Sequence, residues 1–352
     1  MRYIKAIALC LVICLCAMSF SGCGKKKVLR VYNAMDYIDG SVLSAFEKEN
    51  NCIIEYNNYD NNEDAYSVIT SGKLEPYDIV IAREYTISKL IWGDYLQPLN
   101  MSLIPNSSGI DALYKNLEFD AGNKFSLPYM VGTFGVLYNS AHVKEPINGW
   151  NELWNVNNTA KMVMINSQRD GIAVGLSVLG YSVNSKNSKE ITDAKSKLAG
   201  LGRYITGYQN FQIKDNMAAE RIYLAPSYSG DAYYAIAKAA ANNVTLKYEL
   251  PSGGASKFID SFAIMRDAKN ADLAHKFIDY MCRADVATKN SVVSCYTSAV
   301  TAAKAGLPAE MQNSPILYPA KNVWSALPMY DFNLNADELY NKAWLEAKTN
   351  KG

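Results

Sequence analysis

Short apolar runs alternate along the chain with longer segments in which apolar residues recur every three or four positions. The short runs, bounded by Gly, Pro, Asn or Asp, are typical of strands, and the recurring pattern is typical of amphipathic helices. Their alternation from residue 28 onward predicts an α/β protein. The predicted strands are 29–33, 52–56, 77–82, 162–165, 222–225, 244–250 and 262–265, with a long extended segment at 126–139. The predicted helices are 41–50, 64–70, 87–92, 150–154, 171–179, 188–201, 232–241, 272–282, 285–293 and 337–347.

The segment 250–265, LPSGGASKFIDSFAIM, connects two of these strands and is a candidate ligand site. Its Gly-Gly bend permits backbone angles that are closed to other residues. Phe258 and Asp260 are two positions apart in extended chain, so their side chains point to the same side. An anion beside an aromatic ring suits a cationic ligand. The alternative interpretation is that Phe258 belongs to the core and Asp260 is a solvated turn residue.

Carboxylates next to aromatic residues recur where predicted strands end. The pairs are Asp36 with Tyr37, Tyr228 with Asp231, and Phe258 with Asp260, and Asp170 follows a further strand without an aromatic neighbour. Ligands of parallel sheets bind beyond the carboxyl ends of the strands. Each Asp alone could be a helix N-cap or a turn residue. Together, they predict a cleft for a small organic cation.

The chemistry of most enzyme classes is absent from the sequence. Two His residues, His142 and His275, lie far apart, so zinc clusters and His-based triads are not expected. There is no nucleophile elbow and no phosphate loop, and Gly200-Leu201-Gly202 is too incomplete for a dinucleotide site. We therefore expect no enzyme, no cofactor and no metal.

The N-terminus predicts export. A basic head and an apolar stretch at 6–20 form a signal peptide over residues 1–22, and Phe20-Ser21-Gly22-Cys23 resembles a bacterial lipoprotein box. Cys23 would then be lipidated and residues 23–27 would form a tether, anchoring the protein to the outer face of the membrane or in the periplasm. The alternative is an ordinary secreted protein.

Charge and cysteine content narrow the class further. Removing Arg2 and Lys5 with the signal peptide leaves 35 − 2 = 33 basic residues against 34 acidic ones, and no basic stripe indicates nucleic acid as a partner. Beyond Cys23, the mature chain keeps Cys52, Cys282 and Cys295, an odd number that argues against a disulfide framework. Buried thiols are the favoured interpretation, and a Cys282–Cys295 bridge is the alternative.

Nearly the full mature chain resembles the spermidine/putrescine-binding proteins of bacterial ABC transporters. The motifs that carry the resemblance are VYNAMDY, YDIVIA followed by Tyr85, SLPYMVGTFGVLYN, NSQRD before LGYS, SGDAYYA, PSGGASKFIDSFAI and DAKNADLAHKFIDYMCRADVA. The resemblance implies a type II periplasmic-binding-protein-like fold with two α/β lobes, a hinge and a cleft between the lobes. The implied lobes are 28–136 with 260–304, and 137–259 with 305–352.

The resemblance also implies roles for particular residues. Asp260 would hold an amine with Phe258 beneath the alkyl chain; Asp36, Asp170 and Asp231 would serve other amines; Tyr37, Tyr85, Tyr228 and Tyr296 would line the walls. The chain departs from the family where Trp is usual at Ala34, where an Asp is common at Asn166 or Ser167, and where a small polar residue is usual at Arg83. These departures remove aromatic surface and negative charge from the cleft.

The resulting prediction is a monomeric, lipid-anchored receptor that passes a polyamine to the permease subunits of an ABC importer. Three alternatives remain open: the same fold binding another small solute, such as an amino-acid-like zwitterion paired with Arg83; an enzyme of unknown type; and a surface sensor of polyamine occupancy.

Overall fold

The strands in the described part of the chain all join one hydrogen-bonded sheet. The structure is a computed structural model, and it describes residues 26–72, 75–143, 147–155 and 161–349. The sheet order is β2-β1-β3-β9-β4-β7-β5-β6, and β8 and β10 both pair with β4. The strands are β1 Lys27–Ala34, β2 Cys52–Tyr59, β3 Ile79–Arg83, β4 Ser126–Asn139, β5 Met162–Ile165, β6 Ile205–Gln209, β7 Leu224–Tyr228, β8 Leu246–Glu249, β9 Ser256–Ile264 and β10 Thr297–Ser298.

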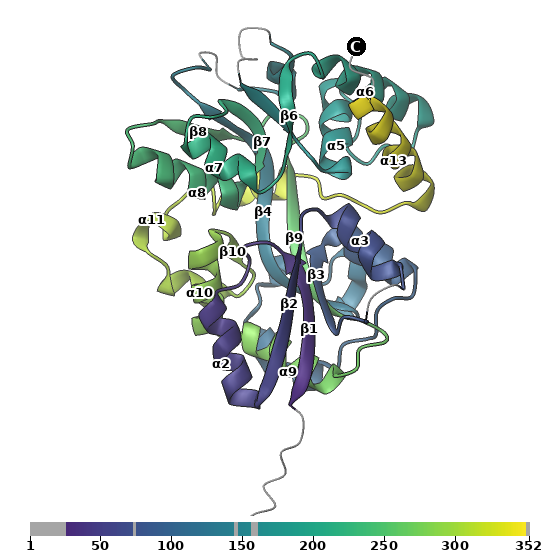
Figure 1. Ribbon diagram of the computed structural model, residues 1–352, viewed down its shortest axis with the longest axis vertical. Helices are drawn as coiled ribbons and strands as arrows, with labels where there is room; N and C mark the ends of the chain where they lie inside the picture. The colour runs from purple at the N-terminus through teal and green to yellow at the C-terminus, as the bar shows by residue number, and fades with distance from the viewer. Residues whose placement is uncertain (1–25, 73–74, 144–146, 156–160, 350–352) are drawn as a thin grey trace, which may run out of the picture.

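Helices flank the sheet on both sides in each lobe (Figure 1). They are α2 Gly40–Asn50, α3 Asn62–Thr70, α4 Glu84–Trp92, α5 Gln168–Val178, α6 Ser188–Leu201, α7 Gln212–Ala218, α8 Ser229–Ala240, α9 Ala271–Met281, α10 Ala284–Ser294, α11 Ala309–Gln312, α12 Lys321–Ala326 and α13 Leu334–Thr349. A short 3-10 helix spans Trp150–Trp154.

The sheet divides into two parallel parts joined by two antiparallel strands. β1 is parallel to β2 and β3 in the lower lobe of Figure 1, and β5 is parallel to β6 and β7 in the upper lobe. β4 and β9 pair antiparallel with each other and run between the lobes. The predicted two-lobed α/β fold is therefore confirmed. The predicted sequence limits of the lobes stay a prediction.

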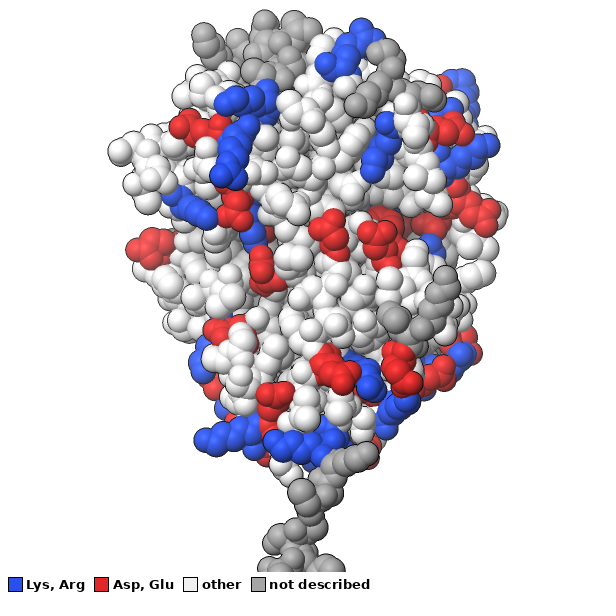
Figure 2. Space-filling view, in the orientation of Figure 1, with Lys and Arg blue, Asp and Glu red and all other residues white. Residues whose placement is uncertain are grey.

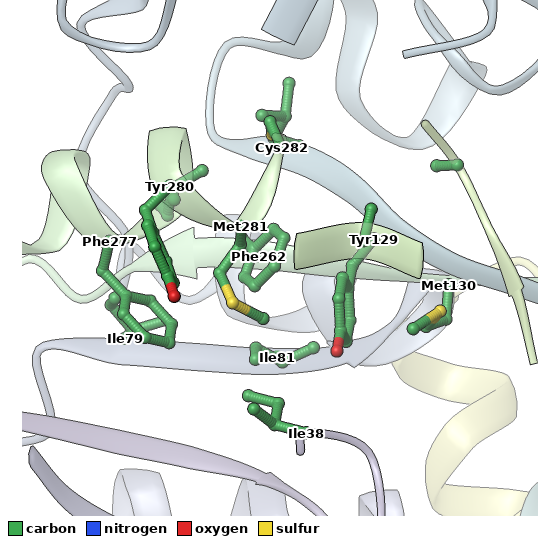
Figure 3. Close-up of a cluster of buried hydrophobic side chains, with 14 of the residues drawn as sticks. Ile38, Ile79, Ile81, Tyr129, Met130, Phe262, Phe277, Tyr280, Met281 and Cys282 are labelled. Atoms are coloured by element: carbon green, nitrogen blue, oxygen red, sulfur yellow. The ribbon is translucent and has the colours of Figure 1, made fainter. Parts of the chain in front are cut away.

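Aromatic and aliphatic side chains fill the core of the lower lobe (Figure 3). Phe277, Tyr280 and Met281 come from the apolar face of α9 and are buried, and Ile79 and Ile81 come from β3. The spacing 277, 280, 281 is the three-to-four-residue repeat of a helix with one buried face. Burying each such side chain contributes about 1.5–3 kcal/mol, so this face fixes α9 against the sheet.

The core of the upper lobe forms where α5, α6 and α13 meet β4 and β5. Helix α5 begins at Ser167, whose hydroxyl accepts a 3.3 Å hydrogen bond from the Asp170 backbone N–H. This N-cap satisfies one of the unpaired donors at the helix start. Ile172, Val174 and Leu176 of α5 are fully buried. The cap therefore places Asp170 at the end of α5 that faces the lower lobe.

Two local predictions are wrong. The strand expected over 222–225 continues to Tyr228, because β7 pairs with β4 through Pro226 and Val136. β5 pairs with β7 only at Leu224, so Pro226 has a neighbouring strand on one side only, where a missing N–H is tolerated. The strand β6 and the helix α7 were not predicted, since their apolar patterns are too short to stand out.

The cysteines Cys52, Cys282 and Cys295 are all free, so the Cys282–Cys295 bridge does not form. Among the described residues, no helix is both long and apolar enough to cross a membrane. The predicted signal peptide and Cys23 lie outside the described residues.

Candidate functional site

A cavity lies between the lobes, at the carboxyl ends of the parallel strands. Its free volume is about 650 Å³ when its open mouth is included. The lining residues are Ala34, Tyr37, Tyr59, Asp60, Asn61, Asn62, Arg83, Ile165, Ser167, Asn210, Phe211, Ile213, Ser227, Tyr228, Asp231, Phe258, Asp260 and Tyr296. Most of them follow or end strands of both lobes, which is where ligands of open α/β sheets bind, and Phe258 and Asp260 lie within β9.

Asp260 and Phe258 of β9 form the centre of the lining. Asp260 is 4% exposed, and its Oδ2 accepts a 2.9 Å hydrogen bond from the Tyr37 hydroxyl. Burial raises the pKa of Asp260 to about 7, although Arg83 and the Tyr37 hydrogen bond act in the opposite direction. The Phe258 ring packs edge to face against Tyr228 and Tyr296, at centroid distances of 5.5 and 6.0 Å.

Glycines bring these rings together. A Cβ at Gly132 of β4 would lie 2.6 Å from the Phe258 ring, and a Cβ at Gly230 of α8 would lie 2.5 Å from the Tyr296 ring. Any other residue at either position would displace the ring beside it. The two glycines therefore hold Phe258 and Tyr296 against the cavity.

Lys214 neutralises a second group of carboxylates. Its Nζ lies 2.8 Å from Asp36 Oδ2 and 3.8 Å from Asp231 Oδ1. Burial raises the pKa of Asp231 to about 6, while Lys214 and the Tyr296 hydroxyl lower it. The sequence analysis missed Lys214, because it belongs to α7.

Arg83 extends from the end of β3 to α5 in the other lobe. Its Nη1 donates to both carboxylate oxygens of Asp170, at 3.1 and 3.2 Å, and Asp170 also accepts a 2.6 Å hydrogen bond from the Tyr228 hydroxyl. Burial acts to lower the pKa of Arg83, but the negative charges of Asp170 and Glu84 outweigh it and raise the pKa. The guanidinium carbon lies 5.4, 5.6, 5.0 and 5.0 Å from the ring centroids of Tyr85, Tyr228, Phe258 and Tyr330.

Two buried glutamates beside the cavity were also missed. Glu63 of α3 accepts hydrogen bonds from the Arg169 backbone N–H at 3.0 Å and from the Ser167 hydroxyl at 3.3 Å, both in the other lobe. Glu84 accepts from the Ile259 backbone N–H at 3.1 Å. Burial raises the pKa of both glutamates. In the sequence, only the adjacency of Arg83 and Glu84 could have signalled either one.

The structure brings most of the predicted site residues to the cavity, although it does not test their roles. Those in the lining are Tyr37, Tyr228, Asp231, Phe258, Asp260 and Tyr296. The other three lie outside the lining: Asp36 has a side chain that is 55% exposed and is paired with Lys214, Tyr85 is buried with its hydroxyl 3.3 Å from Glu63, and Asp170 is fully buried behind Arg83. Acidic side chains gather at mid-height on the face shown in Figure 2, between the two lobes. Among the described residues, no group of His, Cys, Asp and Glu is arranged to hold a metal.

Comparison with known proteins places this geometry in a family. Residues 41–319 match the family of bacterial extracellular solute-binding proteins. The chain belongs to this family. Its membership supports the predicted export, and its relatives are named as binding and transport proteins rather than as enzymes.

Individual relatives match over almost their whole length. The chain is 30% identical to the putrescine-binding periplasmic protein SpuD of Pseudomonas aeruginosa, over 92% of this chain and 93% of that protein. It is 29% identical to the putrescine-binding periplasmic protein PotF of Escherichia coli, over 93% of each. A solved structure titled as a putative spermidine/putrescine ABC transporter from Listeria monocytogenes is 31% identical, covers 92% of this chain and 99% of that one, and has a TM-score of 0.87. The predicted resemblance to spermidine/putrescine-binding proteins is confirmed.

Proposed function

We propose that the protein is the substrate-binding component of an ABC importer and captures a small polyamine, putrescine or spermidine, in the cavity between its lobes. The observation that carries the proposal is Asp260, a buried carboxylate in the lining with no basic side chain at ion-pair distance among the described residues. An ammonium group would supply the missing charge. The names of the relatives SpuD and PotF support the same ligand class.

The rest of the lining fits this ligand. Phe258, Tyr228 and Tyr296 offer aromatic faces to an alkyl chain and its charges, each worth about 0.5–2 kcal/mol to a nearby cation. The carboxylates in and beside the lining, Asp36, Asp60, Asp170, Asp231 and Asp260, outnumber the two cations Arg83 and Lys214, so the cavity keeps an excess of negative charge. That excess favours a cation over a neutral solute or an anion.

Calorimetry with putrescine and spermidine tests the proposal. Asp260→Asn should weaken binding by about 3–5 kcal/mol, a factor between roughly one hundred and several thousand, because the ligand ammonium loses its buried partner. Asp94→Asn is the matched control, since Asp94 is exposed and paired with Arg266 away from the cavity. Equal affinity in the Asp260→Asn and Asp94→Asn proteins would refute Asp260 as the anchor. The absence of binding by the unmodified protein would refute the assignment of a polyamine as its ligand.

A zwitterionic solute is a second candidate. The Nε and Nη2 atoms of Arg83 are buried and have no hydrogen-bond partner among the described residues. A ligand carboxylate could accept from both while its ammonium pairs with Asp260. Binding of an amino acid in preference to putrescine would favour this candidate.

The proposal includes a lipid anchor at Cys23 and docking to membrane permease subunits. Its support is the Ser21-Gly22-Cys23 junction that follows the predicted signal peptide. Cys23→Ala should move the protein from the membrane fraction to the soluble fraction, and Cys52→Ala, at a buried thiol, should not. Retention of the Cys23→Ala protein on the membrane would show that another feature anchors it.

A further inference from the structure

Arg83 makes the contacts that a ligand amine would make in the cavity. Its guanidinium pairs with the buried carboxylate of Asp170 and lies over the rings of Phe258 and Tyr228, both of which line the cavity. A carboxylate with aromatic faces around it is also the environment that binds an ammonium group. We propose that Arg83 is a built-in cation that occupies one amine position and determines specificity, so that the protein selects short amines over longer polyamines. This inference rests on the proposed function.

The charges of the cavity leave few places for ligand amines. Asp170 is paired with Arg83, and Asp231 shares Lys214 with Asp36. Among the carboxylates of the lining, Asp260 accepts its hydrogen bond from the neutral hydroxyl of Tyr37 and is the buried one without a basic side chain at ion-pair distance in the described part of the chain. One ammonium group of a short amine supplies the cation that the Asp260 carboxylate lacks. A triamine would bring a further charge toward groups that Arg83 and Lys214 already neutralise.

The room in the cavity also favours a short amine. The Arg83 side chain is 4% exposed and lies between the aromatic lining and Asp170. Arg83 is itself one of the lining residues, so its side chain takes up space that a longer ligand would need. Shortening Arg83 would extend the cavity to Asp170, whose carboxylate would then lack a cation.

The ion pair also spans the lobes. Arg83 ends β3 of the lower lobe, and Asp170 lies in the first turn of α5 in the upper lobe. A ligand amine in this place would bridge the same two elements. Arg83 therefore replaces a ligand contact that would hold the lobes together, in addition to lining the cavity.

The test compares putrescine with spermidine by calorimetry on the full-length mature protein. The unmodified protein should bind putrescine at least about tenfold more tightly than spermidine. Arg83→Ser should raise the affinity for spermidine by about tenfold or more, because Asp170 becomes available to a third amine. The double variant Arg83→Ser with Asp170→Asn is the matched control: it opens the same space but has no free carboxylate, so it should lack that gain.

Several outcomes would overturn the inference while leaving the proposed function intact. These are an unchanged ratio of the two affinities in Arg83→Ser, an equal gain in the double variant, and an unmodified protein that prefers spermidine. Binding of an amino acid that is lost in Arg83→Ser would show that Arg83 contacts the ligand's carboxylate instead. If no amine binds to any of these proteins, the proposed function itself fails.

A second variant covers the case in which Arg83→Ser does not fold, as judged by its thermal unfolding. Arg83→Gln keeps most of the side-chain volume and can still donate to Asp170, so it tests the charge alone. It should raise spermidine affinity, by less than Arg83→Ser does. A folded Arg83→Gln protein with unchanged selectivity would contradict the inference.

Discussion

The buried carboxyl group of Asp260 makes ligand capture sensitive to pH. Its pKa is raised to about 7 by burial, so a large fraction of the free protein carries a neutral Asp260 just below that pH. A cation pairs with the ionised form, whereas a ligand amine with a pKa near 10 stays charged throughout this range. Binding must therefore remove a proton from Asp260 when the pH is below 7.

Putrescine affinity should consequently rise with pH up to about 7 and then level off. Below pH 7 the loss should approach about tenfold per pH unit, because one proton is displaced for each ligand bound. Calorimetry between pH 5.5 and 8 measures the slope. Asp260→Asn should flatten it, apart from a residual slope near pH 6 from Asp231, whose pKa is about 6. An equally steep slope in that variant would assign the proton to another group.

The raised pKa of Asp260 makes the stability of the free protein fall with rising pH, whereas it makes ligand affinity rise. The folded-state pKa of Asp260 lies above the usual value of about 3.9, so the folded state holds more protons than the unfolded state between about pH 4 and 7. The contribution of Asp260 to stability should thus fall as the pH rises through this window. Thermal unfolding without ligand should show a smaller decline from pH 5 to 7.5 in Asp260→Asn than in the unmodified protein. Equal declines would show that Asp260 does not carry the effect.

Phe258 belongs both to the cavity lining and to the buried core, and its role in ligand binding stays a prediction. Phe258→Leu keeps an apolar side chain but removes the ring face, and should weaken putrescine binding by about 1 kcal/mol, roughly fivefold. Phe262→Leu is the matched control, because Phe262 is buried on the same strand outside the lining. Both variants should lose comparable stability in chemical unfolding. Equal effects on affinity would mean that Phe258 acts only through the core.

At the scale of elements, the contact of β4 with β9 determines the position of the Phe258 ring in the cavity lining. Gly132 pairs with Phe258 across these strands, and its missing side chain leaves room for the Phe258 ring. The sequence analysis did not identify this role. A close approach of two strands depends on their register, which is not readable from either strand alone.

Gly132→Ala should therefore damage both fold and binding. The new methyl group would lie 2.6 Å from the ring, so Phe258 must move, at a cost of about 1–3 kcal/mol in the free energy of unfolding. Gly207→Ala is the control, since Gly207 lies in β6 with nothing within 4 Å of the added carbon. Chemical unfolding and putrescine calorimetry measure both effects. Unchanged values for Gly132→Ala would show that the ring adjusts freely.

The site could be predicted from sequence where it depends on local spacing. Phe258 and Asp260 were found because side chains alternate along an extended strand, and Tyr228 and Asp231 because they follow a strand end. Lys214 could not be found, since the seven-residue helix α7 has too short an apolar pattern. Asp36 was expected at the site, but it lies in a turn with φ 61° and pairs with Lys214 near the surface.

At the scale of the whole molecule, polar contacts hold the two lobes together around the cavity. Lys89 of α4 lies 2.5 Å from Asp337 of α13, and the Asn210 side chain donates to Asp60 at 2.8 Å. Contacts of this kind that solvent still reaches contribute little, about 0–1 kcal/mol each. The Arg83–Asp170 pair is a buried ion pair between the lobes beside the cavity. A ligand in the cavity can therefore increase the population of the arrangement in which these contacts between the lobes form.

Ligand should compact the protein. A ligand that contacts residues of both lobes, such as Asp260 with Tyr228, binds the closed state better than an open one, and it shifts the population by that difference in affinity. Small-angle scattering should therefore show a smaller radius of gyration with saturating putrescine, and hydrogen exchange should slow in 137–139 and 258–261, the predicted crossings between lobes. Asp260→Asn at the same putrescine concentration is the control and should keep the dimensions of the free protein. Identical dimensions with and without bound putrescine, at a concentration where calorimetry shows saturation, would mean that the free protein is already closed, with Arg83 and Asp170 holding the lobes in place of the ligand.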